Sequence, residues 1–106
     1  MGEGIENALA DVWRRSRPHL EARLAAIELA IGALSGESAD PTLVGAGRDQ
    51  AHMLAGVLGT FGLDRGTALA RDLEEHLDRP QACEETARLA HVAAELRVVV
   101  DGAAGA

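Results

Sequence analysis

Aromatic residues and cysteine are nearly missing from this chain of 106 residues, and lysine is missing altogether. Trp13 and Phe61 are its aromatic residues, so an apolar core must be built from Leu, Ala, Val and Ile. Cys83 has no partner for an intrachain disulfide, and a single cysteine forms no zinc-binding cluster. Ala and Leu head the helix-propensity scale, and no stretch alternates as a half-buried strand does. These shortages predict a reduced, helical protein.

Positive charge is also scarce. The chain has ten arginines and 17 acidic residues, so its net charge is -7 with histidine neutral. No basic stripe is available for a nucleic-acid backbone or an anionic membrane surface, so neither is expected as a partner. The N-terminal residues lack the basic and apolar segments of a signal peptide, and no apolar run approaches the roughly 20 residues that span a bilayer. We therefore expect a cytoplasmic location.

Apolar periodicity divides the chain into a short leading helix and four longer ones. The leading helix is predicted over residues 4–15, with a break at Ser16 and Pro18, because proline is tolerated only in the first turn of a helix. The longer helices each carry a one-sided apolar stripe and are separated by short loops. The pattern predicts an all-α fold, an antiparallel four-helix bundle with a short additional N-terminal helix. Residues 1–106 are expected to form a single domain with frayed ends at 1–3 and 102–106.

The third of these helices has the clearest two-sided pattern. Asp40 is predicted to cap its start, and Pro41 suits its first turn. Apolar and small residues recur on one face, which is expected to be buried: Leu43, Gly47, Ala51, Leu54, Leu58 and Phe61.

The opposite face of that helix carries a histidine among glycines. With about 100° per residue, His52 falls about 160° from Leu54 at the centre of the buried stripe, so its side chain is expected in solvent. The same face carries Gly45, Gly56 and Gly59. Each glycine costs roughly 1 kcal/mol relative to alanine in a helix and buries nothing there. Bare backbone around the imidazole would let another protein surface approach it closely.

An exposed imidazole suits nucleophilic chemistry. The histidine side chain in general has a pKa of about 6.5, so much of it is neutral at cellular pH and carries a nitrogen lone pair. Phosphoryl transfer depends on positioning and charge neutralisation, which a partner holding Mg²⁺ and a donor phosphate would supply. Arg48, one turn before His52, is expected to neutralise part of the phosphoryl charge, and Arg65 is a second candidate.

The segment 51–63, AHMLAGVLGTFGL, resembles the signature of histidine-containing phosphotransfer (Hpt) domains. In that signature the histidine is followed by Leu two positions later, Gly four positions later, and a helix end similar to Gly-Thr-Phe-Gly. Residues 68–74, ALARDLE, are similar to the next helix of the family, and the order of helices matches along essentially the whole chain. The resemblance implies a phosphoacceptor at His52 that exchanges its phosphoryl group with an aspartate of a response-regulator receiver domain or hybrid histidine kinase.

The resemblance further implies a phosphorelay carrier without kinase activity of its own. The chain has no Walker A loop and no nucleophile elbow. We expect a monomer that needs no cofactor, with Mg²⁺ on the receiver. Residues expected to support docking or the phosphoryl group are Arg48, Gly45, Gly56, Gly59, Met53, Ala55 and Arg65. Ala55 stands where many family members carry lysine, which leaves open a degenerate Hpt domain that docks partners without phosphotransfer.

Two other functions compete with this hypothesis. The Leu- and Ala-rich stripes are also compatible with a helical interaction or dimerisation module that does not depend on His52. A kinase dimerisation domain would need an acidic residue directly after the histidine, whereas Met53 stands there, and that alternative ranks last.

The other histidines and the paired glutamates have plainer interpretations. His19, His76 and His91 lie on separate helices and form no convincing metal set, so solvated or partly packed side chains are expected. Glu74 and Glu75 are assigned to the solvated outer face of their helix.

Overall fold

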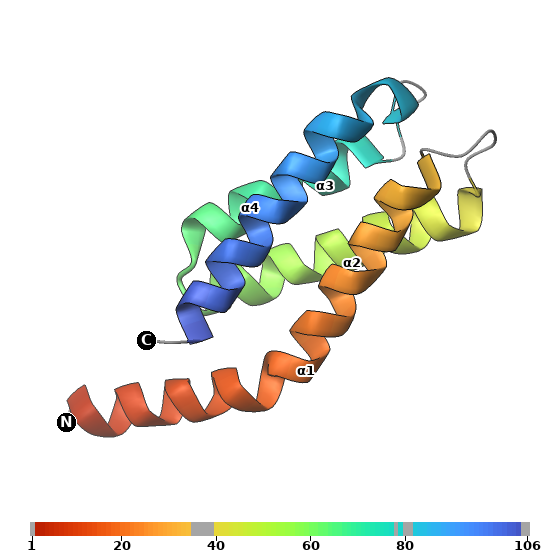
Figure 1. Cartoon of the computed structure of the whole chain (residues 1–106). Coiled ribbons are helices and arrows are strands. Elements are labelled where there is room, and N and C mark those ends of the chain that lie inside the picture. The colour runs from red at the N-terminus through yellow and green to blue at the C-terminus, as the bar shows by residue number, and fades with distance from the viewer. Residues whose placement is uncertain (1, 35–39, 78, 80–81, 105–106) are drawn as a thin grey trace.

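The computed structural model describes residues 2–34, 40–77, 79 and 82–104, and this part of the chain is helical apart from its connections. Within these ranges four α-helices follow one another, and a 3₁₀ turn precedes the last: α1 (Gly2–Leu34), α2 (Pro41–Thr60), α3 (Asp64–Leu77), η1 (Ala82–Glu85) and α4 (Thr86–Ala104). Both α1 and α3 pack against α2 and α4. Figure 1 shows successive helices running in opposite directions around the bundle. The predicted all-α fold is confirmed.

The first helix is continuous, so the predicted break at Ser16 and Pro18, and with it the separate leading helix, is wrong. Pro18 lies inside α1 and removes the hydrogen bond that a backbone N–H there would donate to the carbonyl of Arg14. The apolar stripe nevertheless continues past it, because Trp13 and Leu20, about two turns apart, are both buried. Packing along this stripe outweighs the roughly 3 kcal/mol that proline costs in a helix interior. Figure 1 shows α1 bending along its length, as a helix with an internal proline commonly does.

The two aromatic residues join α1 to the end of α2. The rings of Trp13 and Phe61 meet edge to face, with centroids 4.9 Å apart and planes at 85°. This geometry places the positive edge of one ring against the negative face of the other. Phe61 caps the C-terminus of α2, and Gly62 after it has a φ of 74°, in the left-handed region that glycine favours. The contact therefore fixes the first half of α1 against the point where the chain leaves α2.

The core is mostly aliphatic and draws on all four helices. Within the described residues no polar or charged side chain is buried. Burial of apolar surface therefore holds the bundle together. The largest fully buried side chains are Leu20, Leu24, Ile27, Leu54, Leu58, Leu73, Leu77, Leu89, Leu96 and Val100.

The second helix begins as predicted. The side chain of Asp40 accepts a hydrogen bond from the backbone N–H of Thr42 at 2.9 Å, and Pro41 is in the first turn. Its buried face is rotated toward α3 relative to the predicted stripe, because α3 covers one flank. The residues buried on α2 are Val44, Gly47, Ala51, Leu54, Ala55 and Leu58, whereas Leu43 and Phe61 are half-buried.

Ion pairs align α4 with its neighbours at the surface. Arg97 contacts Glu21 at 2.8 Å and Glu28 at 2.7 Å, both on α1. Hydrogen bonds to Glu28 and then Glu21 raise the pKa of Arg97. Arg88 donates to both carboxylate oxygens of Asp72 on α3 at 2.9 Å. Exposed ion pairs contribute little to the free energy of folding, so these pairs orient α4 more than they stabilise the fold.

The helices extend into the segments that were predicted to fray. The first begins at Gly2 and the last continues to Ala104, while residues 1, 105 and 106 lie outside the described part of the chain. None of the helices in the described ranges combines the length and apolar character needed to cross a membrane.

Gly47 tests the packing of α1 on α2. A Cβ atom at this position would lie 2.3 Å from the Cβ of Ala30 and 3.3 Å from the carbonyl oxygen of Ala26. We expect Gly47→Ala to lower the free energy of unfolding by roughly 1–3 kcal/mol, as overpacked interiors do. Urea denaturation followed by circular dichroism measures this change.

Gly45→Ala is the matched control, because no atom lies within 4 Å of a Cβ built at Gly45. The higher helix propensity of alanine should raise the free energy of unfolding by up to about 1 kcal/mol. Equal stabilities for the two variants would contradict the close approach of α1 and α2 at Gly47.

Candidate functional site

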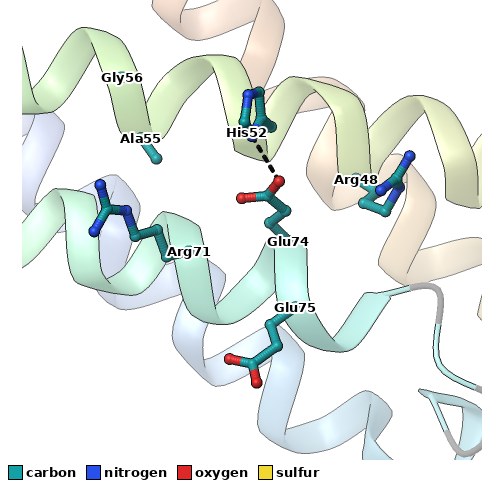
Figure 2. Close-up of a pocket in the computed structure, with 7 residues that line it drawn as sticks. All are labelled: Arg48, His52, Ala55, Gly56, Arg71, Glu74 and Glu75. Carbon is teal, nitrogen blue, oxygen red and sulfur yellow. Dashed lines mark hydrogen bonds and ion pairs between the residues drawn. The ribbon is translucent and has the colours of Figure 1, made fainter.

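A groove of about 580 Å³ opens between α2 and α3. One wall comes from each helix, and the lining residues are Arg48, His52, Ala55 and Gly56 of α2 with Arg71, Glu74 and Glu75 of α3. Figure 2 shows the side chains of His52 and Glu74 pointing toward each other, with Arg48 on one side of His52 and Arg71 on the other. The groove thus brings an imidazole, two guanidinium groups and two carboxylates together.

The spacing on α2 places its four lining residues in one stripe. Positions 48, 52, 55 and 56 follow the three- and four-residue intervals that stack side chains on one side of a helix. The stripe borders the buried face, so Ala55 is only 5% exposed, whereas the His52 side chain is 72% exposed. The predicted exposure of His52 is confirmed.

The imidazole of His52 is oriented by a contact between the two helices. Its Nδ1 lies 2.6 Å from Oε2 of Glu74, whose side chain is 28% exposed. An ionised carboxylate only accepts hydrogen bonds, so Nδ1 carries the hydrogen and donates it. In the neutral ring the lone pair is then on Nε2, the nitrogen available to a partner.

The α3 wall is held against α2 at a second point. Oγ1 of Thr67 donates to the carbonyl oxygen of Ala55 at 3.2 Å. Thr67 and Glu74 lie about two turns apart on one face of α3 and contact α2 at Ala55 and His52, respectively. These two contacts fix the register of the helices along the groove.

A protein-family model described as the Hpt domain matches residues 5–104. This chain belongs to the Hpt domain family. Comparison with curated proteins and with solved structures gave no match. Hpt domains are phosphocarrier modules of two-component phosphorelays and interact with receiver domains and histidine kinases. The resemblance seen in residues 51–63 is therefore confirmed at the level of the family.

Three of the supporting residues predicted for this Hpt domain line the groove beside His52. Arg48 is half-buried and contacts the carboxylate of Asp49 at 3.2 Å. Gly56 is exposed, and a Cβ built on it would meet no atom within 4 Å. Ala55 presents its methyl group to the groove from the border of the core.

The other predicted residues lie elsewhere on the Hpt bundle. Gly45 is half-buried about two turns before His52, and Gly59 is exposed next to the hydroxyl of Thr67. Met53 faces α1, where its sulfur accepts a hydrogen bond from Arg23 at 3.3 Å. Arg65 pairs with Glu95 of α4. Neither Met53 nor Arg65 is among the residues that line the groove.

Sequence reasoning missed the α3 wall of the site. Glu74 was assigned to the solvated outer face, and that assignment is wrong, because its carboxylate contacts His52 across the groove. Glu75, predicted on the same outer face, and Arg71, which was not among the predicted site residues, also line the groove. Their spacing was a usable signal, since positions 71, 74 and 75 share one helix face and the short turn after α2 makes α3 its antiparallel neighbour.

The remaining histidines make contacts within their own helices or with solvent. Nδ1 of His76 lies 2.8 Å from the carbonyl oxygen of Asp72 and 2.9 Å from its carboxylate. Nε2 of His91 lies 2.7 Å from Glu95, and His19 is exposed. Over the described ranges, no group of three or more His, Cys, Asp or Glu side chains is arranged to hold a metal ion.

The contact with Glu74 predicts the tautomer of His52. We expect neutral His52 to carry its hydrogen on Nδ1, and Glu74→Ala to shift the population toward the Nε2–H form, because the acceptor is removed. Nitrogen chemical shifts of the ring, measured by NMR, report this directly. Glu74→Gln is the control, since its amide oxygen still accepts from Nδ1. An unchanged tautomer in Glu74→Ala would show that the contact does not orient the ring.

Proposed function

We propose that this Hpt domain accepts a phosphoryl group on Nε2 of His52 from a receiver-domain aspartate or a histidine kinase, and passes it on in a phosphorelay. The observation that carries this proposal is the exposed imidazole, 72% accessible, whose Nδ1 is held by Glu74 at 2.6 Å. This orientation leaves Nε2 for an incoming phosphorus atom. Membership of the Hpt family supports the same chemistry.

The transfer step uses the imidazole of His52, the carboxylate of Glu74 and a phosphoaspartate of the receiver. The lone pair of Nε2 attacks the phosphorus of a phosphoaspartate, an N–P bond forms, and the P–O bond to the aspartate breaks. The aspartate leaves as a carboxylate, and the ring becomes a positively charged phosphoimidazolium. The proton on Nδ1 stays in the hydrogen bond with Glu74, whose negative charge stabilises the ring. In the reverse step, an aspartate carboxylate of a second receiver attacks the phosphorus, and the N–P bond to the ring breaks.

A receiver must approach His52 closely for this step. The exposed Gly56 leaves the backbone bare one turn after the histidine. Arg48 lines the groove and would face part of the charge of about −2 that a phosphoryl group brings. Mg²⁺ would be held by the receiver, and the Hpt domain would act as a cytoplasmic monomer without a cofactor of its own.

A second candidate function is docking without phosphotransfer. The observation that favours it is Ala55, a neutral methyl group on the groove wall where many family members carry lysine. Such a degenerate domain would bind a receiver across α2 and α3 and would not depend on His52 for binding.

His52→Ala separates the two functions. The parent chain and the variant are incubated with a panel of phosphorylated receiver domains, and acid-labile, base-stable phosphate is followed by intact mass and phosphate-affinity gel. We expect the parent to gain one phosphoryl group and the variant to gain none, because the nucleophile is removed. His91→Ala, which deletes another exposed imidazole, should behave as the parent does. A folded parent that binds a receiver and takes no phosphate would favour docking alone.

Gly56 provides a test of receiver docking. We expect Gly56→Leu to slow transfer from a receiver roughly tenfold, because the added side chain projects where the partner must approach. Stability should be maintained or raised, since leucine is the better helix former. A time course of labelling with a phosphorylated receiver, quenched at successive times, measures the rate. Gly32→Leu on α1 is the matched control, because a Cβ there also meets no atom within 4 Å. Equal slowing by both variants would rule out a specific role for Gly56.

A further inference from the structure

Arg71 differs from the other arginines in the contacts of its side chain. In the described part of the chain no residue makes a hydrogen bond or ion pair with its side chain, although it lines a groove that also contains two carboxylates. Each of the other arginines has at least one such partner. Arg48, the second cation of the groove, contacts Asp49 at 3.2 Å. Arg71 therefore has no competing partner among the described residues, and its positive charge is available for a ligand.

The position of Arg71 is fixed by its neighbours on α3. Thr67, Arg71 and Glu74 are spaced by four and three residues, which places them on one face of the helix. Thr67 contacts the Ala55 carbonyl at 3.2 Å, and Glu74 contacts His52 at 2.6 Å. Arg71 lies between these two anchored positions. Figure 2 shows its guanidinium extending along the groove on the side of Ala55 and Gly56.

The groove needs a cation when the histidine is phosphorylated. Glu74 and Glu75 already line it, and a phosphoryl group adds a charge of about −2. Ala55 contributes no charge from the α2 wall. An arginine offers several N–H donors in a planar fork that matches phosphate oxygens.

We propose that Arg71 is a phosphoryl-binding residue, whose guanidinium donates hydrogen bonds to the phosphoryl oxygens on His52 and supplies from α3 the positive charge that position 55 lacks. This inference rests on the proposed function of His52. It places the nucleophile on the α2 wall and adds a charge-neutralising group opposite it on α3.

A small donor tests Arg71 without the complication of receiver docking. Phosphoramidate is the probe: Nε2 of His52 attacks its phosphorus, the N–P bond to the ring forms, and ammonia leaves with the electron pair of the donor's P–N bond. The rate of labelling, the lifetime of the phosphoryl group after the donor is removed, and its phosphorus NMR shift are measured. Labelling that remains in His52→Ala is subtracted.

We expect Arg71→Ala to slow labelling about tenfold and to change the phosphorus NMR shift, because a charge-assisted contact is lost. Arg71→Lys should keep part of the rate, because the positive charge remains although the planar fork is lost. Adding Ala55→Lys to Arg71→Ala should restore part of it, since a lysine there enters the same groove from the other wall. Arg14→Ala, an exposed arginine of α1 paired with Asp11, should match the parent.

Two patterns would overturn the inference while leaving the function of His52 intact. One is an Arg71→Ala chain that is labelled at the parental rate with an unchanged phosphorus NMR shift. The other is a slowed Arg71→Ala chain that neither the Arg71→Lys replacement nor the added Ala55→Lys change improves, which would indicate a structural role. A parent labelled no faster than His52→Ala would instead overturn the proposed function, and this inference with it.

Discussion

The packing of α2 between α1 and α3 is the constraint on which the site depends. α2 buries one side against α1, where Gly47 leaves room for Ala30, and its flank at Ala55 lies against α3. A helix packed on two neighbours has one remaining arc open to solvent. His52 lies on that arc at the edge nearest α3, so the same packing that stabilises the bundle also forms the groove and brings Glu74 to the imidazole.

The charges of the groove are compatible with reversible binding of the phosphoryl group that is proposed on His52. Arg48, Arg71, Glu74 and Glu75 all line the groove, so the formal charges of the lining side chains balance when the imidazole is neutral. A phosphoryl group on the ring would disturb this balance, and part of its charge would be met by the positive charge created on the imidazole itself. Moderate stabilisation is appropriate for a carrier, because a phosphoryl group held too firmly would not pass to the next receiver.

The first helix illustrates how tertiary contacts override a local signal. Pro18 is a strong indicator of a helix boundary, yet α1 continues through it. The continuing chain buries Trp13, whose ring packs on Phe61 at the end of α2. Nothing in the local sequence around Pro18 reveals that partner, because Phe61 is far away along the chain. The energetic gain of this contact exists only in the assembled bundle.

The sequence by itself determined the helical class, the start of α2 at Asp40 and the outward orientation of His52. These follow from local rules: propensity, capping and the fixed rotation of about 100° per residue. The family resemblance in the segment around His52 is also readable from the sequence. Only the tertiary structure decided that α1 is continuous, that Glu74 holds the imidazole, and that Arg71 lies across from Ala55. Those features depend on the register and rotation of one helix against another, which long-range packing sets and no local pattern specifies.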